Sequence, residues 1–171
     1  IQVIKKYLSL NKNVALIHAG CRNFELFKDL NVKHFLCLSG SEANKFDLLK
    51  INSNSIDIKL IISPYPREMG TFLPKNYDNK IFELDSYTFT KKYHDSLFAI
   101  ALQLALEVNV NNVNLVGFDG YNFDPSNDVS PLTDENQYLI DSFNLKSVIK
   151  INSFTPSQYK NTSTKSIFCN V

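Results

Sequence analysis

Small and polar residues follow two of the apolar segments in this sequence and have the chemistry to bind a ligand. Ser39-Gly40-Ser41 stands before a helical pattern, and Asp119-Gly120-Tyr121 follows an apolar run. Backbone amides at a helix start favour anions such as phosphate, and an aspartate after a buried strand places a carboxylate at the mouth of a ligand crevice. Both groups also fit a purely structural role, because serine caps helices and Asp-Gly forms turns. A single glycine is far short of a dinucleotide-binding or Walker A loop.

The densest group of functional side chains is Tyr93-His94-Asp95-Ser96, at the expected start of a long helix. Helix capping by Asp95 or Ser96 explains this group at little cost. The same side chains at a helix N-terminus are also suited to contact a phosphate or the ribose of a nucleotide. They do not form a Ser-His-Asp triad, because adjacent residues cannot adopt the geometry that a triad needs.

Two histidines are candidates for acid or base catalysis. His18 comes before Ala19-Gly20 at the expected end of a strand, and His94 belongs to the helix start described above. Imidazole changes its charge near neutral pH, which suits proton transfer. A lone histidine is more often structural, and His34, inside an apolar strand pattern, is expected to be a core residue or to have its polar atoms satisfied.

The sequence predicts neither a metal site nor a disulfide framework. Asp119, Asp124 and Asp128 are carboxylates in one region, but their spacing matches no calcium loop. The three cysteines are an odd number without CxxC spacing. Cys37 lies inside an apolar run, where we expect a small buried side chain. This use of cysteine fits a reducing, cytoplasmic setting.

Alternating strand and helix patterns must position these residues. Such alternation implies a mostly parallel sheet covered by helices on both faces, which is a doubly wound α/β fold. The final helix would carry Asp134 and Glu135 in its first turn, where negative charge meets the helix dipole. Strands are expected at 13–17, 33–38, 57–62, 80–84, 112–118 and 146–151, and helices at 1–10, 24–30, 41–51, 94–108 and 132–143.

Ligands of such sheets bind beyond the carboxyl ends of the strands, near the point where the strand order reverses. We therefore collect the residues that follow each expected strand. They are His18-Ala19-Gly20, Ser39-Gly40-Ser41, Ser63-Pro64-Tyr65, Asp119-Gly120-Tyr121 and Ser153-Phe154-Thr155-Pro156-Ser157.

Composition places the chain among globular proteins. Its 171 residues include 18 Lys+Arg and 17 Asp+Glu, for a formal net charge of +1, and 44% are hydrophobic. These values exclude a disordered or fibrous chain, and the length suits one domain over residues 1–171. Near-zero charge argues against nucleic-acid binding through bulk charge. Because no apolar run approaches the roughly 18 residues that cross a bilayer, we expect no membrane span.

A longer segment carries a family resemblance. It comprises the helix pattern Tyr93–Ala105, the strand pattern Val110–Val116 and the turn Gly117-Phe118-Asp119-Gly120-Tyr121. This segment resembles the Rossmann-like domains related to bacterial lipooligosaccharide sialyltransferases and 6-hydroxymethylpterin diphosphokinase-like proteins. It is more similar still to the C-terminal domain that follows an aldolase (HMG-CoA-lyase-like) barrel in proteins encoded with surface-polysaccharide genes.

The resemblance implies a pocket for a nucleotide, nucleotide sugar or sugar phosphate at the strand ends. The domain would be accessory to an N-terminal aldolase-type barrel in bacterial lipopolysaccharide biosynthesis. Two alternatives stay open: an active glycosyltransferase or diphosphotransferase with His18 or His94 as base, and a non-catalytic module that docks on a partner domain. The sequence identifies no cofactor. The expected ligand-binding residues are Ser39, Gly40, Ser41, Asp95, Ser96, Asp119 and Tyr121.

The resemblance also concerns the start of the domain. In the sialyltransferase-like relatives, a first strand ends in a glycine-rich loop that contacts the nucleotide. This chain begins at Ile1, not at a methionine, and opens on the helix that would follow such a loop. We therefore expect the first strand to be absent from this sequence, and the sequence to come from the C-terminal part of a longer protein.

Overall fold

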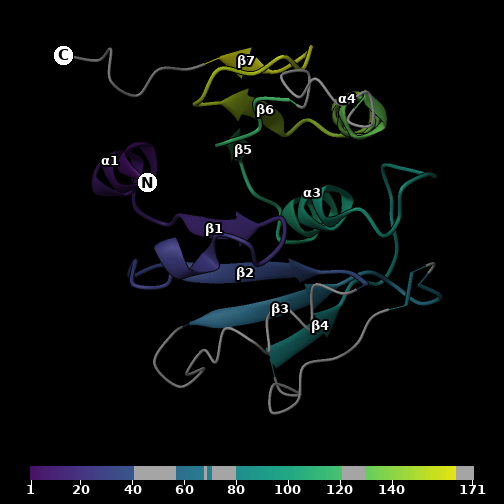
Figure 1. Cartoon of the computed structure of the whole chain (residues 1–171), viewed down its shortest axis with the longest axis horizontal. Helices are drawn as coiled ribbons and strands as arrows, with labels where there is room; N and C mark the ends of the chain where they lie inside the picture. Colours follow the sequence, from purple (N-terminus) through teal and green to yellow (C-terminus); the bar gives the residue numbers. More distant parts are fainter. Residues whose placement is uncertain (41–56, 68, 71–79, 121–129, 165–171) are drawn as a thin grey trace.

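The chain contains both helices and parallel strands, as the sequence patterns predict (Figure 1). The computed structural model describes residues 1–40, 57–67, 69–70, 80–120 and 130–164. The expected helix at 41–51 lies outside these ranges. The elements are α1 (Gln2–Leu10), β1 (Ala15–His18), the 3-10 turn η1 (Phe24–Leu26), β2 (Lys33–Leu38), β3 (Ile58–Ile62), β4 (Ile81–Glu83), α3 (Leu97–Glu107), β5 (Asn112–Leu115), α4 (Ser130–Lys146), β6 (Lys150–Ser153) and β7 (Ser163–Thr164).

The strands form two sheets, and every described pairing is parallel. One sheet has the order β1-β2-β3-β4, and the other has the order β5-β6-β7. Parallel neighbours need crossover connections, so helices and turns come to lie on the faces of the sheets. The predicted α/β class is therefore confirmed, and the arrangement is that of a doubly wound, Rossmann-like fold.

Helix α3 packs against both sheets. One side of it places Ile100 and Leu104 in a buried cluster with Phe35 of β2. Another side places Leu102 in a second cluster with Phe143 of α4, which also contains residues of β5 and β6. A helix that is apolar around most of its circumference is expected at such a buried position. Figure 1 shows α3 between the two sheets.

The opposite face of the first sheet packs against a different cluster. Leu36, Leu38 and Leu60 lie there against Phe24 of η1, whose side chain is fully buried. Residues of β2 therefore alternate between two apolar surroundings, which explains the unbroken hydrophobic run of this strand. Cys37 is buried, as predicted, and burial raises the pKa of its thiol.

The sequence patterns misplaced several element ends. The expected helix at 24–30 is only the short turn η1, and β5 ends at Leu115, ahead of a backbone turn at Gly117 with φ of 75°. Helix α4 begins at Ser130, so the prediction that Asp134 and Glu135 lie in its first turn is wrong. Among the described helices, none is both long and apolar enough to cross a bilayer.

Candidate functional site

The carboxyl ends of β2 and β3 place two serines side by side. The register of the two strands brings their last residues to the same level, and Ser39 and Ser63 follow directly. Side chains alternate between the faces of a strand, so Ser39 shares a face with Cys37, and Ser63 shares one with Ile61. Cys37 and Ile61 both belong to the cluster that packs against α3. Both serine hydroxyls therefore lie on the α3 side of the sheet.

A buried carboxylate connects these strand ends to the start of α3. Asp95 is 8% exposed, and its Oδ1 accepts a hydrogen bond of 2.9 Å from Ser63 Oγ. Its Oδ2 accepts one of 2.6 Å from the backbone N–H of Met69. The N–H of Gly40 donates to the carbonyl of Gly70 at 3.1 Å. We call this group the carboxyl-edge site, and it consists of Ser39, Gly40, Ser63, Met69, Gly70 and Asp95.

One group of this site, and one residue next to it in sequence, have unused hydrogen-bonding capacity. Ser39 is only 7% exposed, and its hydroxyl has no hydrogen-bond partner in the described structure. Ser96 is the N-cap residue of α3, but its side chain makes no capping hydrogen bond. A buried hydroxyl without a partner costs about 1–3 kcal/mol, and the first amides of a helix have no intrahelical acceptor. Both groups are therefore suited to bind a ligand oxygen.

An ion pair lies at the rim of the site. Arg67 donates through Nε to the carbonyl of Ser63 at 3.0 Å, and it forms a salt bridge with Glu83 of β4. The side chain of Arg67 is only 16% exposed. The other carboxylate oxygen of Glu83 accepts a 2.9 Å hydrogen bond from the N–H of Tyr65. The segment after β3 is thus tied to β4, and the Arg67–Glu83 ion pair lies beside Ser63.

The turn after β5 lies near the start of α3. The ring of Phe118 is 4.5 Å from that of Phe98 in the first turn of α3. The backbone of this turn is held by the segment after β6, since Ser157 Oγ donates to the carbonyl of Phe118 at 2.8 Å and Gln158 N–H donates to that of Asp119 at 3.1 Å. Asp119 itself is exposed.

His18 and His34 form a hydrogen-bonded pair. His34 is fully buried, and its Nε2 lies 3.1 Å from the carbonyl of Leu30. A carbonyl only accepts, so Nε2 of His34 carries a proton, and in the neutral ring Nδ1 is the acceptor. His18 Nε2 then donates to that Nδ1 at 3.1 Å. The prediction that His34 is a core residue with satisfied polar atoms is confirmed.

The histidine pair lies apart from the carboxyl-edge site. Ile17 packs on the α3 side of the sheet, so the next side chain, His18, points to the opposite face. There its ring makes an edge contact with Phe24, with centroids 5.2 Å apart. Burial, and secondarily electrostatic repulsion between the two imidazoles when they are protonated, lower the pKa of His18 to about 4. A proton acceptor with that pKa is neutral and weakly basic at pH 7.

His94 is adjacent to Asp95 in sequence, and its ring is held by a neighbouring aromatic side chain. It stacks on the ring of Tyr87 with centroids 5.0 Å apart and an interplanar angle of 9°. The hydroxyl of Tyr87 donates to the carbonyl of His94. Burial is the main reason that the pKa of Tyr87 is raised. The catalytic roles assigned to His18 and His94 stay predictions.

The structure brings part of the expected residue set together. Ser39, Gly40, Asp95 and Ser96 lie at the carboxyl edge of the first sheet, and Asp119 lies at the end of β5. Ser41 and Tyr121 lie outside the described residues, as do Asp124 and Asp128. The described residues include no group of three or more metal-ligating side chains.

Sequence reasoning missed two participants. Arg67 and the amide of Met69 contact Ser63 and Asp95, but no spacing in the sequence connects them. Of the residues in these contacts, Ser63 could be found from the sequence because it follows an expected strand, but Arg67 and Met69 could not.

Comparison of the chain with models of known families, with curated proteins and with solved structures finds no match. The family resemblance of the segment from Tyr93 to Tyr121 therefore stays a prediction.

Proposed function

We propose that this domain binds a nucleotide, nucleotide sugar or sugar phosphate at the carboxyl-edge site. The observation that carries the proposal is the buried hydroxyl of Ser39, which has no partner in the described structure and lies on the same face as the start of α3. Ligands of doubly wound sheets bind beyond the carboxyl ends of the strands. A phosphate or sugar oxygen would satisfy both this hydroxyl and the uncapped amides of α3.

The charged residues of the site and its surroundings have different roles in the proposed binding. Both oxygens of Asp95 already accept hydrogen bonds from Ser63 and Met69, so this carboxylate positions the site. Arg67, only 16% exposed on its side chain, places a guanidinium that is paired with Glu83 at the rim. Asp119 is exposed and is suited to accept hydrogen bonds from sugar hydroxyls.

Binding is favoured over catalysis by the positions of the histidines. The ring of His18 lies on the opposite face of the sheet from Ser63, and the ring of His94 stacks on Tyr87. In the part of the chain that the structure describes, neither ring forms a hydrogen bond with Asp95 or Ser63, the residues that a transferase base would accompany at this site. A glycosyltransferase or diphosphotransferase activity is therefore the second candidate.

The biological setting is a finer proposal, supported only by the resemblance of residues 93–121. We infer a cytoplasmic, bacterial lipopolysaccharide-biosynthesis protein in which this domain accompanies an N-terminal aldolase-type barrel. The parent reading frame tests this directly. A barrel-coding region upstream of Ile1 is the expected result, and a frame without one contradicts this setting.

Replacing Ser39 with alanine is expected to weaken binding of UDP, CMP or glucose 1-phosphate at least about tenfold, because one hydrogen bond to a charged group is worth about 1.5–3 kcal/mol. Isothermal titration calorimetry measures this change. Ser9→Ala on α1 is the matched control and should leave the affinity unchanged. Glucose without phosphate should bind more weakly than its phosphate. If none of the ligands binds, or if Ser39→Ala binds like the original chain, the proposal is wrong.

A further inference from the structure

The two sheets end on strands that face each other without pairing. β1 is the terminal strand of the first sheet, and β5 is the terminal strand of the second. Figure 1 shows β1 as the strand of its sheet nearest to β5. Each of these strands therefore has a row of backbone N–H and C=O groups without a strand partner in the described structure. Such groups normally have hydrogen-bond partners in a folded protein.

β1 and β5 differ from the other two terminal strands. β4 has three residues and β7 has two, and short strands are the usual form of a protected sheet edge. β1 and β5 have four residues each, and the sequence of β1 is Ala15-Leu16-Ile17-His18. An apolar strand without lysine or proline is typical of the middle of a parallel sheet.

Helix α1 connects the two unpaired edges. It leads directly into β1, and the hydroxyl of its Tyr7 accepts a 3.1 Å hydrogen bond from Asn114 of β5. The ring of Tyr7 also lies 5.0 Å from that of Phe154. Although α1 has an apolar side, none of its residues is buried. This helix is therefore placed over both strands, but its apolar side is only partly covered.

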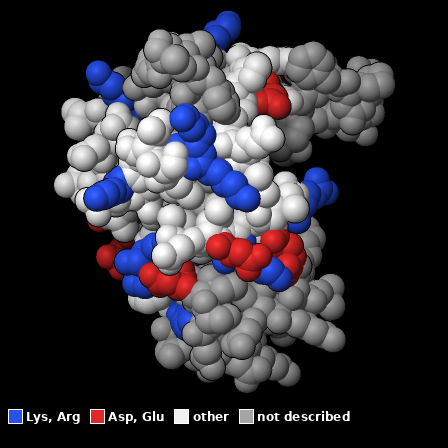
Figure 2. All heavy atoms as spheres, turned by 90° about the vertical axis from the view of Figure 1, so that its left-hand side faces the viewer, with Lys and Arg blue, Asp and Glu red and all other residues white. Residues whose placement is uncertain are grey.

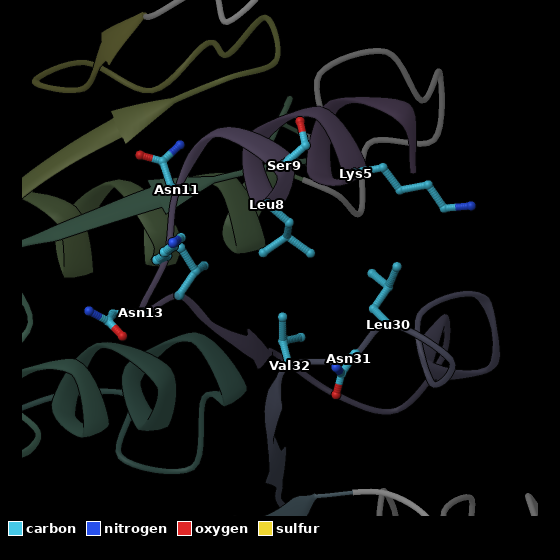
Figure 3. A pocket seen from close by; sticks show the side chains of 10 residues that line it. Lys5, Leu8, Ser9, Asn11, Asn13, Leu30, Asn31 and Val32 are labelled. Atoms are coloured by element: carbon cyan, nitrogen blue, oxygen red, sulfur yellow. The ribbon is translucent and has the colours of Figure 1, made fainter.

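A pocket beside α1 also indicates incomplete packing. It has a volume of about 430 Å³ and lies between α1 and the amino-terminal ends of β1 and β2. Figure 3 shows Leu8, Leu30 and Val32 pointing toward one another across it. Figure 2 shows the side of the molecule where α1 lies, and both basic and acidic side chains are present on it.

We propose that one further strand lies between β1 and β5, parallel to both, and that it is the segment directly ahead of α1 in the full-length protein. It would join the two sheets into the continuous order β4-β3-β2-β1-strand-β5-β6-β7. A strand next to β1 and parallel to it needs a crossover connection, and α1 is a helix in the position of that crossover. A strand from a second copy would lack this connection. The proposal is independent of the ligand.

Residue-resolved amide hydrogen exchange tests the proposal on two forms of the protein. One is the 171-residue chain, and the other is the same chain extended by the residues that its reading frame encodes ahead of Ile1. In the extended form, we expect the amides of β1 and β5 that face the gap to exchange at least about tenfold more slowly, because they gain hydrogen bonds. The amides of β4 are the internal control and should be unchanged. A Gly/Ser extension of equal length should have no effect.

Three results would overturn the proposal. The first is a reading frame without residues ahead of Ile1 that form a strand. The second is a natural extension that leaves exchange in β1 and β5 at the rate of the Gly/Ser control. The third is protection of both strands in the 171-residue chain alone: as a monomer this would mean that β1 pairs with β5, and as a dimer by light scattering it would mean that a second copy fills the gap.

Discussion

Replacing Asp95 with alanine is expected to lower the free energy of unfolding by about 3 kcal/mol. The substitution leaves the hydroxyl of Ser63 and the N–H of Met69 without their acceptor. Each unsatisfied buried polar group costs about 1–3 kcal/mol, and Ser63 is only 1% exposed. Urea denaturation, followed by far-ultraviolet circular dichroism, measures the change.

Two further variants make the Asp95 result specific. Asp95→Asn keeps one acceptor oxygen and should fall between the original chain and Asp95→Ala. Asp134→Ala removes an exposed carboxylate of α4 and should change stability by less than about 0.5 kcal/mol. If Asp95→Ala is as stable as Asp134→Ala, Asp95 does not hold the carboxyl-edge site together.

Acid is expected to destabilise the folded chain through His18. Burial lowers the pKa of this residue from its ordinary value of 6.5 to about 4. Between these two values the unfolded chain binds a proton that the folded chain excludes, so stability falls as the pH is lowered from about 6.5 to about 4. The full shift corresponds to about 3 kcal/mol.

The variant His18→Gln isolates this contribution. Glutamine does not titrate, and its amide can still donate a hydrogen bond to Nδ1 of His34. The free energy of unfolding, measured by urea denaturation at several pH values, should therefore decrease less steeply in the variant between pH 6.5 and pH 4. Parallel curves for the two proteins would show that His18 is not the group responsible.

The regular elements were predictable because their signals are local. The apolar run of β2 has the bounds Lys33–Leu38 in both sequence and structure, since a strand buried on both faces is apolar throughout. The extent of η1 was not predictable, because the pattern at 24–30 does not distinguish a full helix from a single turn that buries Phe24. Ser163–Thr164 of β7 is polar and short, and it has no periodic signal.

The candidate site was predictable only in part. Strand ends indicated Ser39 and Ser63, because the carboxyl edge of a parallel sheet follows from the fold class. The hydrogen bond between Ser63 and Asp95 joins residues 32 positions apart, and the salt bridge of Arg67 depends on the path of the chain after β3. Contacts of this kind arise from tertiary packing and have no signature in a single sequence.

The central position of α3 has a consequence for synthesis on the ribosome. The strands β1 to β4 leave the ribosome before α3 does, yet one face of their sheet, with Phe35 and Ile61, is buried by Ile100 and Leu104 of that helix. This face stays in contact with water until translation has passed Glu107. Nascent chains that stall earlier would present an uncovered apolar sheet, the kind of surface that chaperones bind. Completion of α3 is thus the step that covers this face of the first sheet, and the other side of α3 is covered only when β5, α4 and β6 have followed.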